Sequence, residues 1–439
     1  MKTKKLILLP LLALAVGSLA SCNLFGKKKD KPVVWSFSDE MEEICEELYG
    51  DDVEFDYKTS VKQVTDDLRN ARRSGRGVPD IIALEAAVVA DFTALASTDE
   101  ECYLEPLDDV GDTSDMYEYT KKVATSTDGK MLALSWQATP GGFFYRKSIA
   151  SKLGINSPEA MEAKISTWQG FLELAAECSA YDLDTSTAGV QKIYITSSIT
   201  EPIKVFLGGT RDKAWVENGK LQLEDKLFGT NGVENSCFDI IRALQTNGYT
   251  HQTGEREPGW YGNMRGNDTL GYFCSSWGLH FDLMAKATTT FGDWQMCKAP
   301  SHYFKGGTWL AIPKGCEHPE EAKKIIKDIT LDKEFLRKRC EKTGDFMNSR
   351  SLMQELSANA SCDFLGGQNH LKILYEVANS ITGELISPYD LHLDNLFTSC
   401  AADFAKDEAS SAQEVDDARQ DQIDIFIANA REYLGNAFF

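Results

Sequence analysis

The sequence predicts an α/β protein made of two lobes, each a mostly parallel β-sheet flanked by helices. The first observation is length: about 410 residues follow an apolar leader, more than one hydrophobic core usually supports. The second is order: early in the chain, short apolar runs alternate with amphipathic stretches in the pattern β-α-β-α-β, which requires parallel strands and right-handed crossovers.

The first 21 residues have the three parts of a secretory signal peptide. Lys2, Lys4 and Lys5 make a positive start, residues 6–19 are mostly apolar, and small residues follow. The apolar run is too short to cross a hydrocarbon core of ~30 Å as a helix. We therefore expect residues 1–21 to be removed on export.

Cys22 directly follows Leu19, Ala20 and Ser21, and these four residues resemble a bacterial lipobox. In that motif the thiol receives a diacylglycerol and becomes the mature amino terminus, and two or more acyl chains anchor a protein stably. Residues 22–31 would then form a polar tether. The alternative is an ordinary cleaved signal in which the cysteine has no role.

The first lobe begins with an apolar strand at residues 32–37. Met41, Ile44, Cys45 and Leu48 then form the stripe of an amphipathic helix that begins after Ser38 and ends before Gly50. A second strand follows at residues 53–57.

A second helical stripe (Val61, Val64, Leu68, Ala71) and a buried third strand at residues 80–84 complete the unit. In parallel sheets, ligands bind in the crevice beyond the carboxyl ends of the strands. Ser38, Asp39 and Glu85 are therefore predicted to face a cleft.

Further helices are expected at residues 167–178, after Pro319, and across most of 387–439. Thr167 suits a helix amino terminus, and Pro319 suits the first helical turn. The acidic faces of the last segment are those of a solvated surface.

Charge and cysteine usage exclude some classes of function. The formal net charge of −21 argues against a nucleic-acid partner, because the phosphate backbone would repel it. Ten cysteines follow Cys22 without a CxxC pair, so we expect buried small hydrophobes with one or two disulfide bridges.

Motifs for catalysis are missing from the sequence. The six histidines lie far apart, and no nucleophile elbow, Walker loop, dinucleotide fingerprint or calcium loop occurs. We therefore expect no catalytic residue, metal or cofactor. A pair of carboxylates placed for glycoside hydrolysis could still be assembled in space.

Several of the eight tryptophans lie beside glycine or polar residues. A flat indole offers its face to the C–H side of a sugar ring, while nearby amides and carboxylates take the hydroxyls. Trp136, Trp277 and Trp309 are predicted to lie at a saccharide site, whereas Trp35, Trp215 and Trp294 are assigned to packing.

Eight segments occur in a distinctive order along the chain. They are residues 33–37 (VVWSF), 79–84 (PDIIAL), 134–137 (LSWQ), 142–147 (GFFYRK), 167–171 (TWQGF), 272–278 (YFCSSWG), 306–313 (GGTWLAIP) and 318–322 (HPEEA). In these segments and their order the chain resembles the saccharide-binding branch of the extracellular solute-binding proteins of bacterial ABC importers, similar to maltose-binding proteins. One departure is Ser135, where that family commonly has proline.

The resemblance implies a periplasmic-binding-protein-like fold with a hinge between the lobes. Residues 32–137 and 310–345 would form the first lobe, and 138–309 and 346–439 the second. The crossing segments are expected near residues 135–140, 305–315 and 343–350.

A ligand between the lobes would close them by hinge bending, and the closed form would dock on an ABC permease. The chain is expected to be a monomer, held outside the cytoplasm at the cell envelope by the lipid on Cys22.

The predicted ligand-binding residues combine the strand ends with the aromatic segments. Glu85 would take two adjacent hydroxyls, and Ser38 and Asp39 would donate or accept. For Asp39, a helix amino-terminal charge is an equal alternative. The full set is Ser38, Asp39, Glu85, Trp136, Gln137, Trp277, Gly278 and Trp309.

Two other functions stay open from sequence. One is a surface lipoprotein that hydrolyses or modifies glycans. The other is the same receptor fold serving a non-sugar solute such as a polyamine or a phosphorylated compound.

Overall fold

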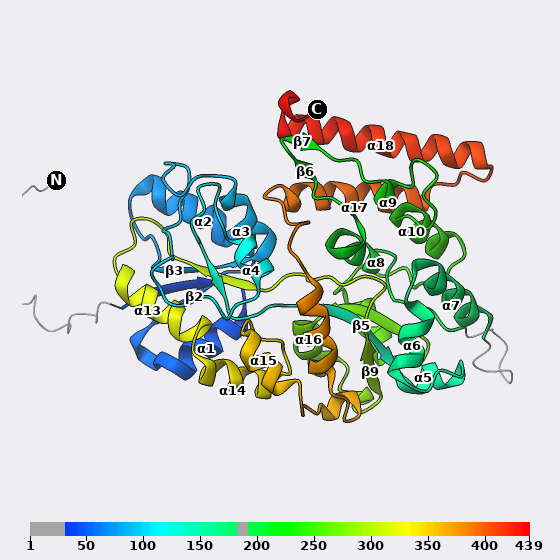
Figure 1. The fold of residues 1–439 in the computed structure, drawn as a ribbon, viewed down its shortest axis with the longest axis horizontal. Helices are drawn as coiled ribbons and strands as arrows, with labels where there is room; N and C mark the ends of the chain where they lie inside the picture. Colours follow the sequence, from blue (N-terminus) through cyan, green and yellow to red (C-terminus); the bar gives the residue numbers. More distant parts are fainter. Residues whose placement is uncertain (1–30, 182–191) are drawn as a thin grey trace, which may run out of the picture.

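The computed structural model describes residues 31–181 and 192–439, which form two lobes with a sheet in each (Figure 1). The larger sheet has the strand order β2-β1-β3-β10-β4, and the smaller has the order β8-β5-β9. The two-lobed α/β fold is therefore confirmed. The predicted signal peptide, Cys22 and nearly all of the tether lie outside the described residues.

The first lobe opens with the predicted β-α-β-α-β unit. Its strand β1 pairs in parallel with both β2 and β3, as the pattern required. Ser38 and Ser60 cap the two crossover helices by accepting hydrogen bonds from backbone N–H groups. The elements are β1 (Val33–Ser36), α1 (Asp39–Tyr49), β2 (Glu54–Tyr57), α2 (Val61–Ser74), β3 (Ile81–Glu85) and α3 (Ala86–Thr93).

Strands β10 and β4 complete the larger sheet, in which β10 alone runs antiparallel to the other strands. Strand β10 (Thr308–Ala311) pairs with β3 on one side and with β4 (Leu134–Ser135) on the other. Because β10 pairs with β3 along its whole length, Thr308 and Trp309 belong to the sheet of the first lobe. The prediction placed both residues in the second lobe, with the boundary after residue 309. Helices α4 (Glu118–Val123), α13 (Pro319–Thr330) and α14 (Lys333–Thr343) also belong to this lobe.

The second sheet differs from the prediction in strand direction. Strand β5 (Gly141–Arg146) is antiparallel to both β8 (Gly271–Ser275) and β9 (Trp294–Cys297). A mostly parallel sheet is therefore wrong for these three strands. Every residue of β5 is buried. Strands buried along their whole length are more typical of parallel sheets, so burial does not indicate the antiparallel direction observed here.

The helices of the second lobe cover this small sheet and extend it. A π-helical turn at Phe206–Thr210 continues α8, and another at Leu279–Met284 continues α12. The helices before β9 are α5 (Lys147–Lys152), α6 (Pro158–Ile165), α7 (Trp168–Ala180), α8 (Glu201–Val205), α9 (Asp225–Phe228), α10 (Cys237–Thr246), α11 (Pro258–Arg265) and α12 (Ser276–Gly278).

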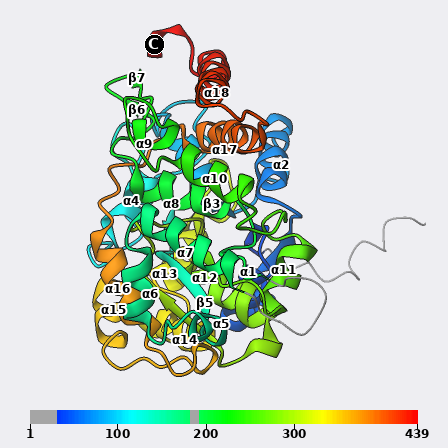
Figure 2. The ribbon, with the colours of Figure 1, turned by 90° about the vertical axis from the view of Figure 1, so that its right-hand side faces the viewer.

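The carboxyl-terminal segment is helical, as predicted. Helix α15 (Arg350–Leu356) packs on α16 (His370–Ser380), which contacts β5 and β9. Helix α17 (Asp390–Lys406) lies between α10 and α18 (Ala412–Leu434), and Figure 2 shows these helices stacked at one end of the molecule. Helix α17 also contacts α3 of the first lobe, so it bridges the two lobes.

Three segments carry the chain between the sheets. The chain passes from β4 to β5 at residues 136–140, from β9 to β10 at 298–307, and from α14 to α15 at 344–349. The second crossing therefore comes earlier than the predicted 305–315. The segments bond to one another: the Ala138 N–H donates to the Phe346 carbonyl (3.0 Å), and Pro140 bridges Phe304.

The cysteines behave as small hydrophobic residues. Eight of the ten in the described residues are buried, and Cys316 and Cys362 are half-buried. All ten are free thiols, so the one or two predicted bridges are absent from the described part of the chain. Two lobes of this size have enough apolar core to fold without them.

Candidate functional site: a cleft between the lobes

A cleft of about 930 Å³ lies between the lobes. One side of the cleft is formed by the first sheet, the opposite side by the second lobe, and the base by the crossing segments. The side formed by the first sheet is called the rim, and the side formed by the second lobe is called the wall. The rim consists of Phe37, Ser38, Asp39, Tyr57 and Glu85.

The rim lies where β1, β2 and β3 end. Phe37, Ser38 and Asp39 follow β1, Tyr57 ends β2, and Glu85 ends β3. The three strands are parallel neighbours, so their carboxyl ends meet at one edge and present these side chains together. The strand-end rule applied to the sequence thus placed Ser38, Asp39 and Glu85 on the cleft.

Two rim residues also begin helices. The Ser38 hydroxyl accepts a hydrogen bond from the Glu40 N–H (3.2 Å), and the Glu85 carboxylate accepts one from the Ala87 N–H (2.9 Å). Burial raises the pKa of Glu85, although the nearby positive charge of Lys305 opposes the shift. One Glu85 oxygen is used by the cap, and the side chain still reaches the cleft.

A buried ion pair supports the rim from behind. Arg339 of α14 donates to Glu40 of α1 at 2.7 Å, and their side chains are 1% and 5% exposed. Arg339 also pairs with Glu43 at 3.3 Å. Because α1 begins directly after Ser38, these contacts fix the start of α1 and hence the rim.

The wall is centred on Trp277 of α12. Its indole N–H donates to the Lys305 carbonyl (2.9 Å), which orients the ring. The Arg256 guanidinium lies 4.4 Å from the ring centroid, a cation–π contact. Arg256 pairs with Asp282 at 3.1 Å, and the Tyr261 hydroxyl donates to the same carboxylate at 3.1 Å.

A second pair neutralises the wall deeper in the cleft. Lys204 of α8 bonds to Glu255 and donates to the Phe273 carbonyl at 3.1 Å. The charges of Glu255 and Asp282 hold the pKa values of Lys204 and Arg256 above their usual values, although burial opposes both shifts. The wall therefore presents paired charges beside aromatic faces.

Gln137 joins the crossing segments at the base of the cleft. Its amide donates to Asp345 at 2.6 Å and accepts from the Thr308 N–H at 3.1 Å. Asp345 also accepts from the Ser276 hydroxyl of the second lobe. The NH₂ group and the carbonyl oxygen of the Gln137 side chain are thus both hydrogen-bonded within the protein. The structure shows these contacts with the crossing segments and no contact with a ligand.

Helix α17 closes one end of the cleft with Asp394, Asn395 and Thr398. The Trp215 indole N–H donates to an Asp394 oxygen at 2.7 Å, which fixes that carboxylate. Because α17 also contacts α3, the cleft is bounded by both lobes at this end.

The tryptophans divide sharply. Trp277 is half-buried and lines the cleft, whereas the other seven are at most 8% exposed. The packing role assigned to Trp35, Trp215 and Trp294 is confirmed. The buried indoles are those of Trp35, Trp136, Trp168, Trp215, Trp260, Trp294 and Trp309.

Three predicted site residues do not reach the cleft. Trp136 and Trp309 are 0% exposed, and the Trp309 N–H donates to the Thr120 carbonyl (3.3 Å). Gly278 is buried inside α12. The stacking role predicted for these two indoles does not fit their position, because neither offers a ring face to the cleft. The structure brings together Ser38, Asp39, Glu85, Gln137 and Trp277.

The prediction missed most of the cleft's aromatic surface. Phe37 and Tyr57 lie at strand ends, so the rule that found Ser38 and Glu85 would have found them as well. Tyr261 lies between Trp260 and Gly262 in the sequence, so the pattern of an aromatic residue beside glycine would have indicated it. No sequence signal indicated Arg256, Phe281 or Asp394, since only tertiary packing brings them here.

No cluster of three or more His, Cys, Asp or Glu in residues 31–181 and 192–439 is arranged to hold a metal ion. None of the helices in these ranges is long and apolar enough to cross a membrane.

The chain belongs to the family of bacterial extracellular solute-binding proteins, whose pattern it matches over residues 41–358. The family match covers more than half of the chain and both lobes. Comparison of the sequence with curated proteins finds no match.

Solved structures share the fold over nearly the whole chain. One is an ABC-transporter-associated binding protein from B. animalis subsp. lactis Bl-04 in complex with β-1,6-galactobiose. It is 20% identical in sequence, the match covers 91% of this chain and 98% of the other, and the TM-score is 0.67. Another is the GacH receptor of Streptomyces glaucescens, described unliganded and with acarbose: 14% identity, 92% and 98% coverage, TM-score 0.67.

A third is the Thermus thermophilus maltotriose binding protein with maltotriose: 14% identity, 91% of this chain, 100% of the other, TM-score 0.63. At these identities the comparisons establish the fold. The ligand has to be argued from the cleft.

Proposed function

We propose that this chain captures a saccharide in the cleft between its lobes and delivers it, unreacted, to an ABC permease. The observation that best supports a saccharide ligand is the composition of the cleft. Aromatic side chains line both sides, Phe37 and Tyr57 on the rim and Trp277 on the wall, with polar groups between them. Sugar rings match this surface because one side is C–H and the edges carry hydroxyls.

The size of the cleft supports an oligosaccharide. Its volume of about 930 Å³ lies near the upper end of the ~300–1,000 Å³ usual for small-molecule sites. The solved relatives named above hold di- and trisaccharides or acarbose, by their own descriptions.

The charges of the cleft are mixed, so they do not choose between a neutral ligand and a polyamine. Six acidic residues line it (Asp39, Glu40, Glu85, Glu255, Asp282 and Asp394) beside four basic ones (Lys204, Arg256, Lys286 and Lys305), and the preference for a saccharide rests on the aromatic faces. Lys204 and Arg256 are already paired with carboxylates, which leaves no strong site for a phosphate there.

A thermal-shift screen tests this proposal. A ligand that binds only the native state raises its melting temperature. The purified mature chain is expected to shift with neutral oligosaccharides and not with spermidine or sugar phosphates, and chromatography should return the saccharide uncut. A shift only with spermidine or a sugar phosphate, or cleavage of the saccharide, would overturn the proposal.

The proposal includes a lipid anchor at Cys22 and a location outside the cytoplasm at the cell envelope. It is supported by the sequence Leu19-Ala20-Ser21-Cys22 and by the extracellular family. Mass spectrometry of the membrane-bound protein is expected to show a diacylglyceryl-modified Cys22. A Cys22→Ala variant released from the membrane would agree, and one that stays bound would contradict the anchor.

The proposed cycle uses the three crossing segments as a hinge. The lobes, 32–137 with 308–345 and 138–307 with 346–439 once β10 is placed in the first sheet, would close on the ligand, shifting the equilibrium by its differential affinity for the closed state. Thr139, Gly306 and Gly307 all have positive φ (53°, 69° and 99°), and they lie on two of the crossings.

A further inference from the structure

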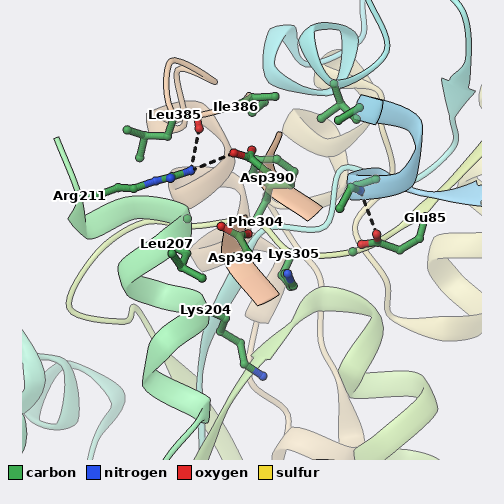
Figure 3. A pocket seen from close by; sticks show the side chains of 16 residues that line it. Glu85, Lys204, Leu207, Arg211, Phe304, Lys305, Leu385, Ile386, Asp390 and Asp394 are labelled. Atoms are coloured by element: carbon green, nitrogen blue, oxygen red, sulfur yellow. Dashed lines mark hydrogen bonds and ion pairs between the residues drawn. The ribbon is translucent and has the colours of Figure 1, made fainter. Parts of the chain in front are cut away.

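A smaller cavity of about 70 Å³ opens beside the cleft, between α3, the π-helical turn after α8, and α17 (Figure 3). We call it the side pocket. Its residues Glu85, Lys204, Leu207, Lys305, Gly306 and Asp394 also line the cleft, so the two spaces adjoin.

The walls of the side pocket are mostly apolar. Ala86, Ala90 and Val123 come from the first lobe, and Leu207, Phe304 and Ile386 close the other sides. A sugar hydroxyl pressed against such a wall would lose its hydrogen bonds to water without replacement. A group with a methyl end would instead gain from burial.

The charges at the back of the side pocket are already paired. The Arg211 guanidinium donates to the Leu385 carbonyl (2.8 Å) and lies 3.5 Å from Asp390, as Figure 3 shows. The Arg211 side chain is only 3% exposed. Lys204, at the cleft side, is bonded to Glu255, so a charged substituent would find Arg211, Asp390 and Lys204 already engaged.

The polar groups within reach of a guest lie at the mouth of the side pocket. Glu85, Asp394 and Lys305 line both this pocket and the cleft, as their labelled side chains in Figure 3 show for the pocket. Within the described residues, Nε and Nη1 of Arg211 and Oδ1 of Asp390 have no hydrogen-bond partner, but these atoms are buried behind the lining. The mouth therefore offers a donor, Lys305, and two acceptors, Glu85 and Asp394, beside an apolar lining.

The volume limits the size of the group. About 70 Å³ is room for about five water molecules at ~10–15 Å³ each by the same measure. A further pyranose ring is too large, whereas a short substituent on a ring held in the cleft would fit.

We propose that the side pocket receives the acetamido group of an N-acetylated amino sugar whose ring lies in the cleft. The methyl group would pack on Ala90, Leu207 and Ile386, while the amide N–H and carbonyl meet the acceptors and the donor of the mouth. This inference rests on the proposed function and narrows its substrate class to oligosaccharides that contain N-acetylhexosamine.

Matched sugars test the inference by calorimetry on the mature chain. N-acetyllactosamine differs from lactose by replacement of one hydroxyl with an acetamido group, and N,N′-diacetylchitobiose differs from cellobiose by two such replacements, one on each ring. Chitobiose, with free amines, is the charged arm of the second pair. In at least one pair the acetylated sugar should bind at least tenfold more tightly than its hydroxyl counterpart, and diacetylchitobiose should bind more tightly than chitobiose.

Two variants fill the side pocket. Ala90→Leu and Ala87→Leu each add a larger side chain to its lining; both residues line the side pocket and not the cleft. Each should reduce the preference for the acetylated sugar to less than threefold and leave the affinity for the hydroxyl sugar unchanged. Ala94→Leu, at the end of α3 and outside both cavities, is the matched control.

The outcomes separate this inference from the function beneath it. Binding of lactose or cellobiose with no gain from the acetamido group, or a preference that survives both filling variants, overturns the side-pocket proposal alone. Tighter binding of chitobiose than of its acetylated form also overturns it, in favour of an amine. Failure of every saccharide to bind overturns both proposals.

Discussion

The rim and the wall of the cleft are built in different ways. The rim takes five side chains from the ends of three parallel neighbouring strands, within residues 37–85. The wall takes its side chains from α8, from α11 and the segment before it, from β8, and from α12 and the π-helical turn after it, between residues 200 and 286.

This difference decides what each side can contribute. Rim side chains are positioned by the sheet and by two helix caps, with one buried ion pair behind them. Wall side chains are positioned by one another, through Trp277, Arg256, Asp282 and Tyr261. Damage to the rim's support should therefore cost stability first, and damage to the wall should cost affinity first.

The largest expected effect is on the support of the rim. Arg339→Met leaves the buried Glu40 carboxylate without its partner, which typically costs ~3–5 kcal/mol. Chemical denaturation is expected to show this loss in the free energy of unfolding. The double variant Glu40→Leu with Arg339→Met should recover most of it. A single variant as stable as the parent would show that the pair does not hold the rim.

A smaller effect concerns the third crossing segment. Burial raises the pKa of Asp115, but hydrogen bonds from Ser349, the backbone and side chain of Ser351, and Lys333 outweigh it and lower the pKa to about 2. Because the folded pKa lies below the unfolded value, the stabilisation is present above the unfolded pKa and is lost as pH falls through the folded one.

We therefore expect Asp115→Asn to be about 2 kcal/mol less stable than the parent at pH 7, an upper value because Asp115 is partly exposed. The difference should shrink as the pH falls from about 4 toward 2. Denaturant curves at pH 7, 4 and 3 measure it. If the difference in the free energy of unfolding between parent and variant is the same at all three pH values, the ionised Asp115 is not its cause.

On the wall, Trp277→Ala is expected to weaken saccharide binding at least tenfold, which corresponds to about 1.4 kcal/mol. The ring is the cleft's one indole in the described residues, and Trp277→Phe should retain part of the affinity. Trp294→Phe, a fully buried indole in the same lobe, should lower stability without changing the dissociation constant. Equal losses in both variants would remove the stacking role.

The smallest expected effect is at the outer rim. Tyr57 is 49% exposed at the end of β2, so Tyr57→Ala should weaken binding about threefold and leave stability within ~0.5 kcal/mol. Calorimetric titration beside the parent measures this. A loss as large as that of Trp277→Ala would show that the rim contributes as much stacking as the wall.

Sequence reasoning reached the rim because the chemistry there is local. Period-2 and period-3.6 patterns identify β1 to β3 and their helices, and strand ends in a parallel sheet converge by geometry. The same logic failed on the second sheet, since the apolar run of β5 does not reveal that its partners are antiparallel.

The tryptophans show why the wall could not be read in the same way. Trp136, Trp277 and Trp309 have similar neighbours in the sequence, yet only Trp277 faces the cleft. Burial of an indole depends on which elements pack over it, and local sequence does not encode that contact. Arg256 and Asp394 reach the cleft for the same tertiary reason.

A crystal structure of the mature chain with the tightest-binding saccharide of the screen would test the central claim most directly. The account predicts one sugar chain in the cleft, in contact with rim residues such as Glu85 and with the Trp277 ring at once. A sugar bound to one lobe only, or away from Trp277, would contradict it.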